Sequence, residues 1–261
     1  MTNCIKTNPT PPLSDNGIED LKVPPSWVRA IIGQSPIYEY IAFGGKYITI
    51  LKLLCDLKSD SNVLDLGCGC GRVTRPLYYY LRDGKYVGVD VNIMALAWCK
   101  KFFVKPNFRF IYADIINRAY NPTGITEFKD YKFPFEDEYF DILIAISVFT
   151  HNLPPWDEAL KELARVTKKG GRFFATFMTI DNEPEIIGET TQKKKDFIPY
   201  NDLCHTRSIP TPEAGLSQKK DYIIESFNKA GFELKSFHWG NWAGKRDYLE
   251  HQDVFVFEKL S

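Results

Sequence analysis

From residue 62 onward, short apolar runs alternate with stretches that carry helix-start and helix-end signals. The runs are apolar on both faces, as expected of parallel strands that lie buried between helices. This alternation predicts a doubly wound, Rossmann-like α/β sheet that is mostly parallel. The predicted strands are 62–67, 85–90, 108–114, 140–147 and 171–179.

Helical stretches separate most of these runs. One helix is expected to start at Gly71, and a second after Asn92, which suits an N-cap. A third is expected from about Pro155 to Lys168, with Gly170-Gly171 as its C-terminal stop.

The end of the chain departs from this alternation. A helix is expected at 217–230, and two apolar runs at 232–239 and 253–259 follow it with no helix between them. Strands joined by a loop pair most easily as antiparallel neighbours. The predicted sheet therefore has seven strands, mostly parallel, with an antiparallel last strand.

The remaining segments give the domain organisation. Residues 1–25 contain five prolines and predict an extended or disordered arm. Residues 26–60 predict a helical cap, interrupted at Gly44-Gly45, ahead of a main domain at 61–261. Residues 180–216 are rich in proline and charge, which predicts a long inserted loop that acts as a lid.

Composition excludes several classes of protein. Lys and Arg total 33 against 33 Asp and Glu, so no nucleic-acid partner is expected. No apolar run reaches the roughly 18 residues of a membrane span, and the first residues lack the apolar core of a signal peptide. The six cysteines form no disulfide framework, and no second pair accompanies Cys68 and Cys70. We therefore expect free thiols, a cytoplasmic protein and no metal site.

The first predicted strand runs into a glycine-rich turn, GCGCGRVTRPL. A strand, glycines and then a helix is the arrangement that brings backbone N–H groups to a ligand. Dinucleotide-binding loops have a third glycine or alanine where this chain has Arg72. Asp65, two residues before Gly67, is unfavourable beside a pyrophosphate and suits a cationic ligand.

The segment VLDLGCGCGR resembles the first motif of class I S-adenosylmethionine-dependent methyltransferases. The resemblance implies S-adenosyl-L-methionine as cofactor, with the glycine loop around its methionine part. It also implies that Asp90 holds the ribose, which agrees with the ability of a carboxylate at a strand end to accept two hydroxyls. The cofactor-binding residues implied in this way are Asp65, Gly67, Cys68, Gly69, Gly71, Asp90, Val91, Asn92, Asp114, Ile115 and Ser147.

Finer resemblance extends to one subgroup. GRVTRPL, NPTG, SVFTH and GNWAGKR…HQDVFVF resemble bacterial methyltransferases associated with glycan biosynthesis. This implies a small-molecule or sugar hydroxyl as the methyl acceptor. Trp242 and Arg246 follow the sixth predicted strand and are candidate substrate contacts.

His151 is the candidate catalytic and substrate-binding residue. It follows the fourth predicted strand, whose carboxyl end faces the ligand in this topology. A neutral histidine is a suitable base for the proton of a hydroxyl acceptor, so O-methylation is favoured. The nearby NLPPW differs from the motif of DNA-base amino-methyltransferases because Leu153 interrupts it.

Three alternatives remain open at this stage. One is an N- or C-methyltransferase that acts on another small metabolite. The others are a nicotinamide-dependent oxidoreductase and a cofactor-binding subunit without activity. The number of subunits is not indicated by the sequence.

Overall fold

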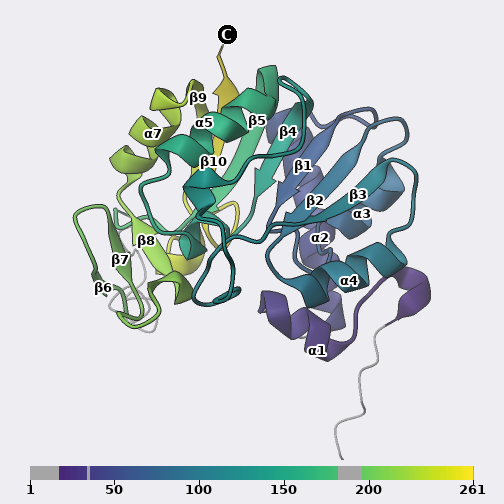
Figure 1. The fold of residues 1–261 in the computed structure, drawn as a ribbon, viewed down its shortest axis with the longest axis horizontal. Helices are drawn as coiled ribbons and strands as arrows, with labels where there is room; N and C mark the ends of the chain where they lie inside the picture. Colours follow the sequence, from purple (N-terminus) through teal and green to yellow (C-terminus); the bar gives the residue numbers. More distant parts are fainter. Residues whose placement is uncertain (1–17, 34–35, 182–195, 261) are drawn as a thin grey trace, which may run out of the picture.

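The apolar runs form one seven-stranded sheet in the computed structural model, which describes residues 18–33, 36–181 and 196–260 (Figure 1). The strand order is β3-β2-β1-β4-β5-β10-β9, and β10 is antiparallel to both of its neighbours. The strands are β1 (Val63–Leu66), β2 (Tyr86–Asp90), β3 (Phe108–Tyr112), β4 (Phe140–Ala145), β5 (Thr167–Phe177), β9 (Phe232–His238) and β10 (Asp253–Lys259). The predicted fold class, including the antiparallel last strand, is confirmed.

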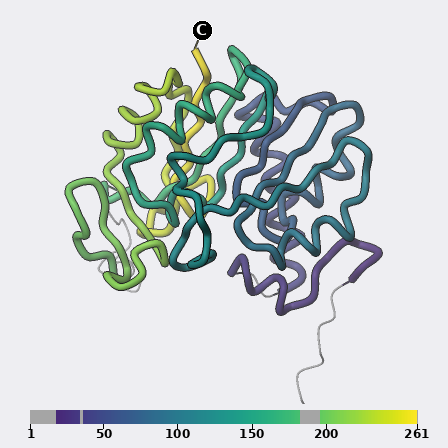
Figure 2. Tube along the Cα trace, in the orientation of Figure 1, coloured from purple at the N-terminus to yellow at the C-terminus, as the bar shows by residue number. Residues whose placement is uncertain are grey.

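Helices cover both faces of the sheet and make two cores. Leu64 and Leu143 point into the core under α5 and α7, whereas Val63 and Ile144 point into the core under α2 and α3. Figure 2 shows the same layering as a continuous trace. The helices are α1 (Ser26–Arg29), α2 (Ile37–Cys55), α3 (Thr74–Tyr80), α4 (Ile93–Phe102), α5 (Asp157–Val166) and α7 (Lys220–Lys229). Alternate residues of one strand thus enter opposite cores, which explains runs that are apolar on both faces. The exceptions are β3 and β9, which are only partly buried because they are the two edge strands.

Two glycine pairs behave differently from the prediction. The helix α2 continues through Gly44-Gly45, because Gly44 packs against the backbone of Arg72, where a Cβ would lie 2.4 Å from the carbonyl oxygen. Gly170-Gly171 do not end a helix. The helix α5 stops at Val166, and the glycines lie inside β5. Gly170 has a φ of 72°, a conformation that glycine adopts without strain.

The N-terminal arm is only partly within the described residues. Residues 1–17 lie outside them, but 18–25 pack on the domain instead of extending away from it. A short 3-10 helix (η1, Glu19–Leu21) lies between Ile18 and Val23, and Val23 is fully buried.

The predicted lid is partly structured. Residues 182–195 lie outside the described residues, whereas 196–218 form an antiparallel sheet of β6 (Ile198–Pro199), β7 (Cys204–Thr206) and β8 (Leu216–Gln218). A 3-10 helix (η5, Pro212–Ala214) precedes β8. Leu216 and Cys204 are fully buried, so this part is a packed element and not the irregular loop that its composition predicted.

No helix among the described residues is long and apolar enough to span a membrane.

Candidate functional site

A cavity of about 410 Å³ opens at the carboxyl ends of β1, β2 and β4. Eight residues singled out in the sequence line it, namely Gly67, Gly69, Asp90, Val91, Asn92, Ile115, Ser147 and His151. Six others do not line it, namely Asp65, Cys68, Gly71, Asp114, Trp242 and Arg246.

The glycine loop leaves β1 with three residues in the left-handed region. The φ angles of Gly67, Gly69 and Gly71 are 64°, 54° and 89°. A Cβ on Gly69 would lie 2.4 Å from Cγ2 of Ile32, and one on Gly71 would lie 2.4 Å from a ring carbon of Phe103. Gly67 and Gly69 therefore allow the backbone to approach a ligand, whereas Gly71 allows tight packing of the following turn.

Asp65 lies beneath this loop and not in the cavity wall. The Tyr86 hydroxyl donates to its Oδ2 (2.7 Å), and the same hydroxyl is 2.6 Å from the hydroxyl of Thr74. Burial raises the pKa of Asp65 to about 7, although the Tyr86 bond opposes the shift. The geometry gives Asp65 a supporting position, joined to β2 and α3.

Asp90 ends β2 and lies in the cavity wall. Its Oδ2 accepts the backbone N–H of Gly69 (2.7 Å), and its Oδ1 accepts that of Asn92 (2.7 Å). Burial raises the pKa of Asp90, and the backbone donors oppose that shift. Each carboxylate oxygen has a second lone pair, so Asp90 can still accept two ligand hydroxyls. Asn92 also caps α4 through its side chain.

The end of β3 contributes an apolar wall. The Asp114 carboxylate turns away from the cavity and accepts the Tyr112 hydroxyl (2.9 Å) and the Asn121 amide (3.1 Å). Ile115 lines the cavity together with Phe128 and Phe133. These two phenylalanines were not predicted. Their only sequence signal is the aromatic segment FKDYKF between two strands.

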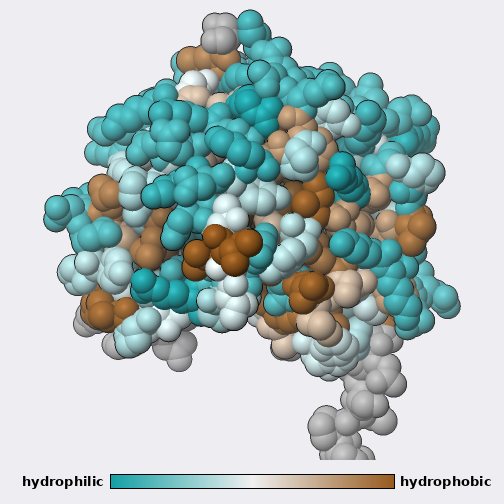
Figure 3. All heavy atoms as spheres, in the orientation of Figure 1, coloured by the Kyte–Doolittle hydropathy of each residue, from teal (hydrophilic) through white to brown (hydrophobic). Residues whose placement is uncertain are grey.

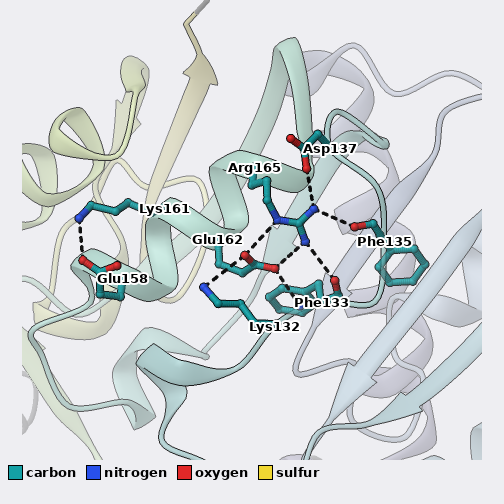
Figure 4. Close-up of polar contacts among 8 residues, drawn as sticks. All are labelled: Lys132, Phe133, Phe135, Asp137, Glu158, Lys161, Glu162 and Arg165. Atoms are coloured by element: carbon teal, nitrogen blue, oxygen red, sulfur yellow. Dashed lines mark hydrogen bonds and ion pairs between the residues drawn. The ribbon is translucent and has the colours of Figure 1, made fainter.

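A polar network on α5 fixes the segment that carries Phe133 (Figure 4). Glu162 is 4% exposed, and its side chain accepts the Phe133 N–H (2.9 Å). The Arg165 guanidinium bonds to Glu162 and to the carbonyls of Phe133 and Phe135. The polar face of α5 thereby sets one wall of the cavity.

His151 enters the cavity from the 3-10 helix η4 (Phe149–His151), just after β4. Its Nδ1 is 2.7 Å from the carbonyl oxygen of Glu213 in η5, and a carbonyl only accepts, so Nδ1 carries the proton in the neutral ring. Its Nε2 then has a free lone pair and no bonded partner among the described residues. Burial lowers the pKa of His151, which favours the neutral ring. Asn117, another lining residue that was not predicted, donates to the His151 carbonyl (2.6 Å).

Ser147 has a φ of 58°, which is unusual for a residue other than glycine. It lies in the cavity wall between β4 and η4. Its N–H donates to the Thr176 hydroxyl (2.8 Å) on β5. Such strain is typical of residues held in place at functional sites.

The loop between β9 and β10 reaches the cavity with other residues than those predicted. The Trp242 indole is buried, packs edge-on against Phe197 and donates to Asp253 (2.9 Å). Arg246 is exposed outside the cavity. Instead Glu250, His251 and Gln252 line it. Their position just before the last strand was the available signal.

The helix α2 and the glycine loop close the opposite wall with Phe43, Tyr47 and Arg72. The Arg72 guanidinium lies over the rings of Phe43 and Tyr47, at 5.8 and 6.0 Å from their centroids. Glu250 of the β9–β10 loop forms an ion pair with Lys46 of α2. This wall therefore combines aromatic faces with charged groups. Within the described residues, no group of three potential metal ligands occurs.

Comparisons with known proteins identify a similar domain. Residues 64–175 match the family model described as a methyltransferase domain. A phthiotriol/phenolphthiotriol dimycocerosates methyltransferase of Mycobacterium tuberculosis is 29% identical over 121 residues, 46% of this chain and 39% of that protein. A fatty-acid O-methyltransferase of Mycolicibacterium smegmatis is 28% identical over 114 residues, 44% of this chain and 36% of that protein. The matched region thus spans about two fifths of each relative.

A solved structure shares the fold. It is a 1,6-didemethyltoxoflavin-N1-methyltransferase of Burkholderia thailandensis with bound 1,6-didemethyltoxoflavin and S-adenosylhomocysteine. The TM-score is 0.53 at 13% identity, over 82% of this chain and 76% of that chain. At this identity the likeness concerns the fold alone.

Proposed function

We propose that this protein, which carries a class I S-adenosylmethionine-dependent methyltransferase domain, transfers a methyl group to a hydroxyl group of a small molecule or sugar. S-adenosylmethionine is the cofactor of this domain. When bound, it supplies a methyl group already activated on a sulfonium. The protein then has to bind, align and desolvate the acceptor and remove its proton.

The cavity residues fit this cofactor. A Cβ on Gly67 would lie 2.8 Å from Cγ2 of Val148, so a residue with a side chain would clash at this position of the turn. Asp90 offers lone pairs for two ribose hydroxyls. Ile115, Phe128 and Phe133 offer an apolar slot suited to a purine ring. We therefore expect the purine between β2 and β3 and the methionine part over the glycine loop.

The observation that carries the proposal of O-methylation is the state of His151. Its Nδ1 proton is held by the Glu213 carbonyl, and its Nε2 lone pair has no partner among the described residues. A lowered pKa favours the neutral ring, which can accept a proton. An alcohol needs such a base during methyl transfer, because its proton must leave as the new C–O bond forms.

The names of the relatives bear on the kind of acceptor. The names of the relatives above refer to lipids, so the glycan association of the sequence resemblance gains no support from them. One relative is named as an O-methyltransferase, in line with an oxygen acceptor. A cytoplasmic location remains a prediction from the sequence.

The test is a labelled-methyl assay with purified protein against fractionated small molecules, lipids and glycans, followed by mass spectrometry of the product. We expect label on an oxygen atom. Label found only on nitrogen or carbon would contradict the proposal and favour the alternative methyltransferase classes.

A further inference from the structure

Three residues at the carboxyl edge of the sheet form a hydrogen-bonded chain that ends in the cavity. The Ser147 N–H donates to Oγ1 of Thr176 (2.8 Å), and the Thr176 hydroxyl donates to Oε1 of Gln252 (2.6 Å). The three residues follow β4, lie on β5 and precede β10, which are adjacent strands. These hydrogen bonds therefore link the His151 side of the site to the β9–β10 loop.

This series of hydrogen bonds fixes the orientation of the Gln252 amide. Thr176 is fully buried, and its hydroxyl has a single proton. Since that oxygen already accepts the Ser147 N–H, its proton is available for Gln252. The structure pairs this hydroxyl with the amide oxygen, so the amide NH₂ group points away from Thr176.

The NH₂ group of Gln252 is a donor without a bonded partner among the described residues. Gln252 is only 8% exposed and lines the cavity. Its neighbour Glu250 already pairs with Lys46. The amide NH₂ group of this largely buried side chain is therefore available to donate to an acceptor atom of a ligand in the cavity.

We propose that Gln252 determines acceptor specificity by donating a hydrogen bond to an oxygen atom next to the hydroxyl that is methylated. This inference rests on the proposed function and adds a substrate class to it. His151 takes the proton of the hydroxyl, and Gln252 binds the neighbouring oxygen. The acceptors are then vicinal diols, sugars or hydroxy acids and not isolated alcohols.

The test compares the wild type with Gln252→Glu and Gln252→Met. The glutamate variant keeps an oxygen for the Thr176 hydroxyl but loses the donor, and the methionine variant keeps the length without charge. Labelled-methyl transfer is measured on paired probes that differ in one oxygen: catechol with phenol, methyl glucoside with methyl 2-deoxyglucoside, and 2-aminophenol with aniline. Calorimetry with S-adenosylhomocysteine is run on each protein.

We expect the wild type to prefer the oxygen-bearing member of at least one pair by about tenfold or more in kcat/KM, a difference typical of one hydrogen bond. Both variants should lose most of that preference and bind S-adenosylhomocysteine like the wild type.

Three results would overturn the inference. They are a wild type without preference in any pair (including no transfer at all), a preference that survives in both variants, and affinity for S-adenosylhomocysteine that falls about tenfold in both variants. The last result would assign the amide to the cofactor. Failure of O-methylation is distinguishable, because methylation of the nitrogen in 2-aminophenol and aniline still reports the oxygen preference.

Discussion

Asp90 is the side chain that joins the glycine loop to the neighbouring strand, through one bond to the Gly69 N–H and one to the Asn92 N–H. Replacing it with alanine removes both these bonds and the charge offered to a ribose. We expect Asp90→Ala to weaken S-adenosylhomocysteine binding about 10- to 100-fold, since charge-assisted hydrogen bonds contribute roughly 1.5–3 kcal/mol.

Calorimetry measures this effect, and Asp114→Asn is the matched control. The Asp114 carboxylate ends the adjacent strand but turns away from the cavity. The affinity of Asp114→Asn for S-adenosylhomocysteine should stay within about threefold of that of the wild type. Equal losses of affinity in both variants would contradict the assignment of Asp90 to the ribose.

His151 gives a prediction for the pH profile. Burial lowers its pKa below the ordinary value of about 6.5. The active form is the neutral ring, so turnover should rise with pH through a pKa below that value and be level at neutral pH. His151→Ala should lose turnover by about 10²–10⁴-fold while binding cofactor almost normally. Turnover within about threefold of the wild type, with the acidic limb unchanged, would contradict the role of His151 as a base.

The sequence predicted which residues follow the strands but not where each side chain points. Asp65, Asp90 and Asp114 occupy similar places in the motif pattern, yet only Asp90 lines the cavity. The difference arises from hydroxyl partners that hold the other two carboxylates elsewhere: Tyr86 on the next strand for Asp65, and Tyr112 two residues earlier for Asp114. Likewise, Gln252 belongs to the segment HQDVFVF, but only its contact with Thr176 shows that its amide NH₂ group is available as a donor.

The helix α5 supports a cavity wall through its polar face (Figure 4). Glu162 is buried and bonded to Phe133 and Arg165, whereas Glu158 forms an exposed pair with Lys161 on the same helix. We expect Glu162→Ala to lower the free energy of unfolding by about 2–4 kcal/mol, because it leaves a buried donor and a cation without their partner.

The exposed pair provides the matched control for urea unfolding. Glu158→Ala should cost about 0–1 kcal/mol, as is usual for surface ion pairs. A similar small cost for Glu162→Ala would show that the network does not hold the Phe133 segment.

The inserted element 196–218 contacts the site through the bond from His151 to the Glu213 carbonyl. It also contacts η4 through Gln218, whose amide donates to the Phe149 carbonyl (3.0 Å). We predict that cofactor and acceptor slow amide hydrogen exchange in this element, because closure over the ligands would stabilise it. Exchange that is slow and independent of ligand would make the element a fixed wall and not a lid.

Element boundaries were predictable where one physical signal dominated. The Asn92 cap and the apolar runs gave α4 and the strands to within a few residues. The glycine pairs misled, because a glycine that packs against backbone and one that ends a helix look alike in sequence. The sheet in 196–218 was missed since its strands are only two or three residues long.

In the whole molecule, the sheet brings together residues far apart in the chain. The cavity combines the glycine loop and the segment after β4, which follow the carboxyl ends of parallel strands, with residues 250–252. These residues precede β10, whose amino end lies at the same edge because the strand is antiparallel to β5. Hydrophobic side chains gather in the middle of one face, among mostly hydrophilic neighbours (Figure 3). Two exposed hydrophobic residues are Ile93, which begins α4, and Ile125, which lies in the loop after β3.

The prediction of a methyltransferase domain with a Rossmann-like fold is confirmed by the family match at residues 64–175 and by the strand order of the sheet. The acceptor could not be predicted in this way. Besides His151, the cavity wall includes side chains from α2 and from residues 250–252, which lie outside the matched residues 64–175.

The most direct test of the central claim is calorimetry of the full chain with S-adenosylhomocysteine and, separately, with NAD. We predict saturable one-to-one binding of S-adenosylhomocysteine and no measurable binding of NAD, because Arg72 replaces the third glycine of a dinucleotide loop and Asp65 lies beneath it. Binding of NAD without binding of S-adenosylhomocysteine would contradict the assignment of the cavity and the function built on it.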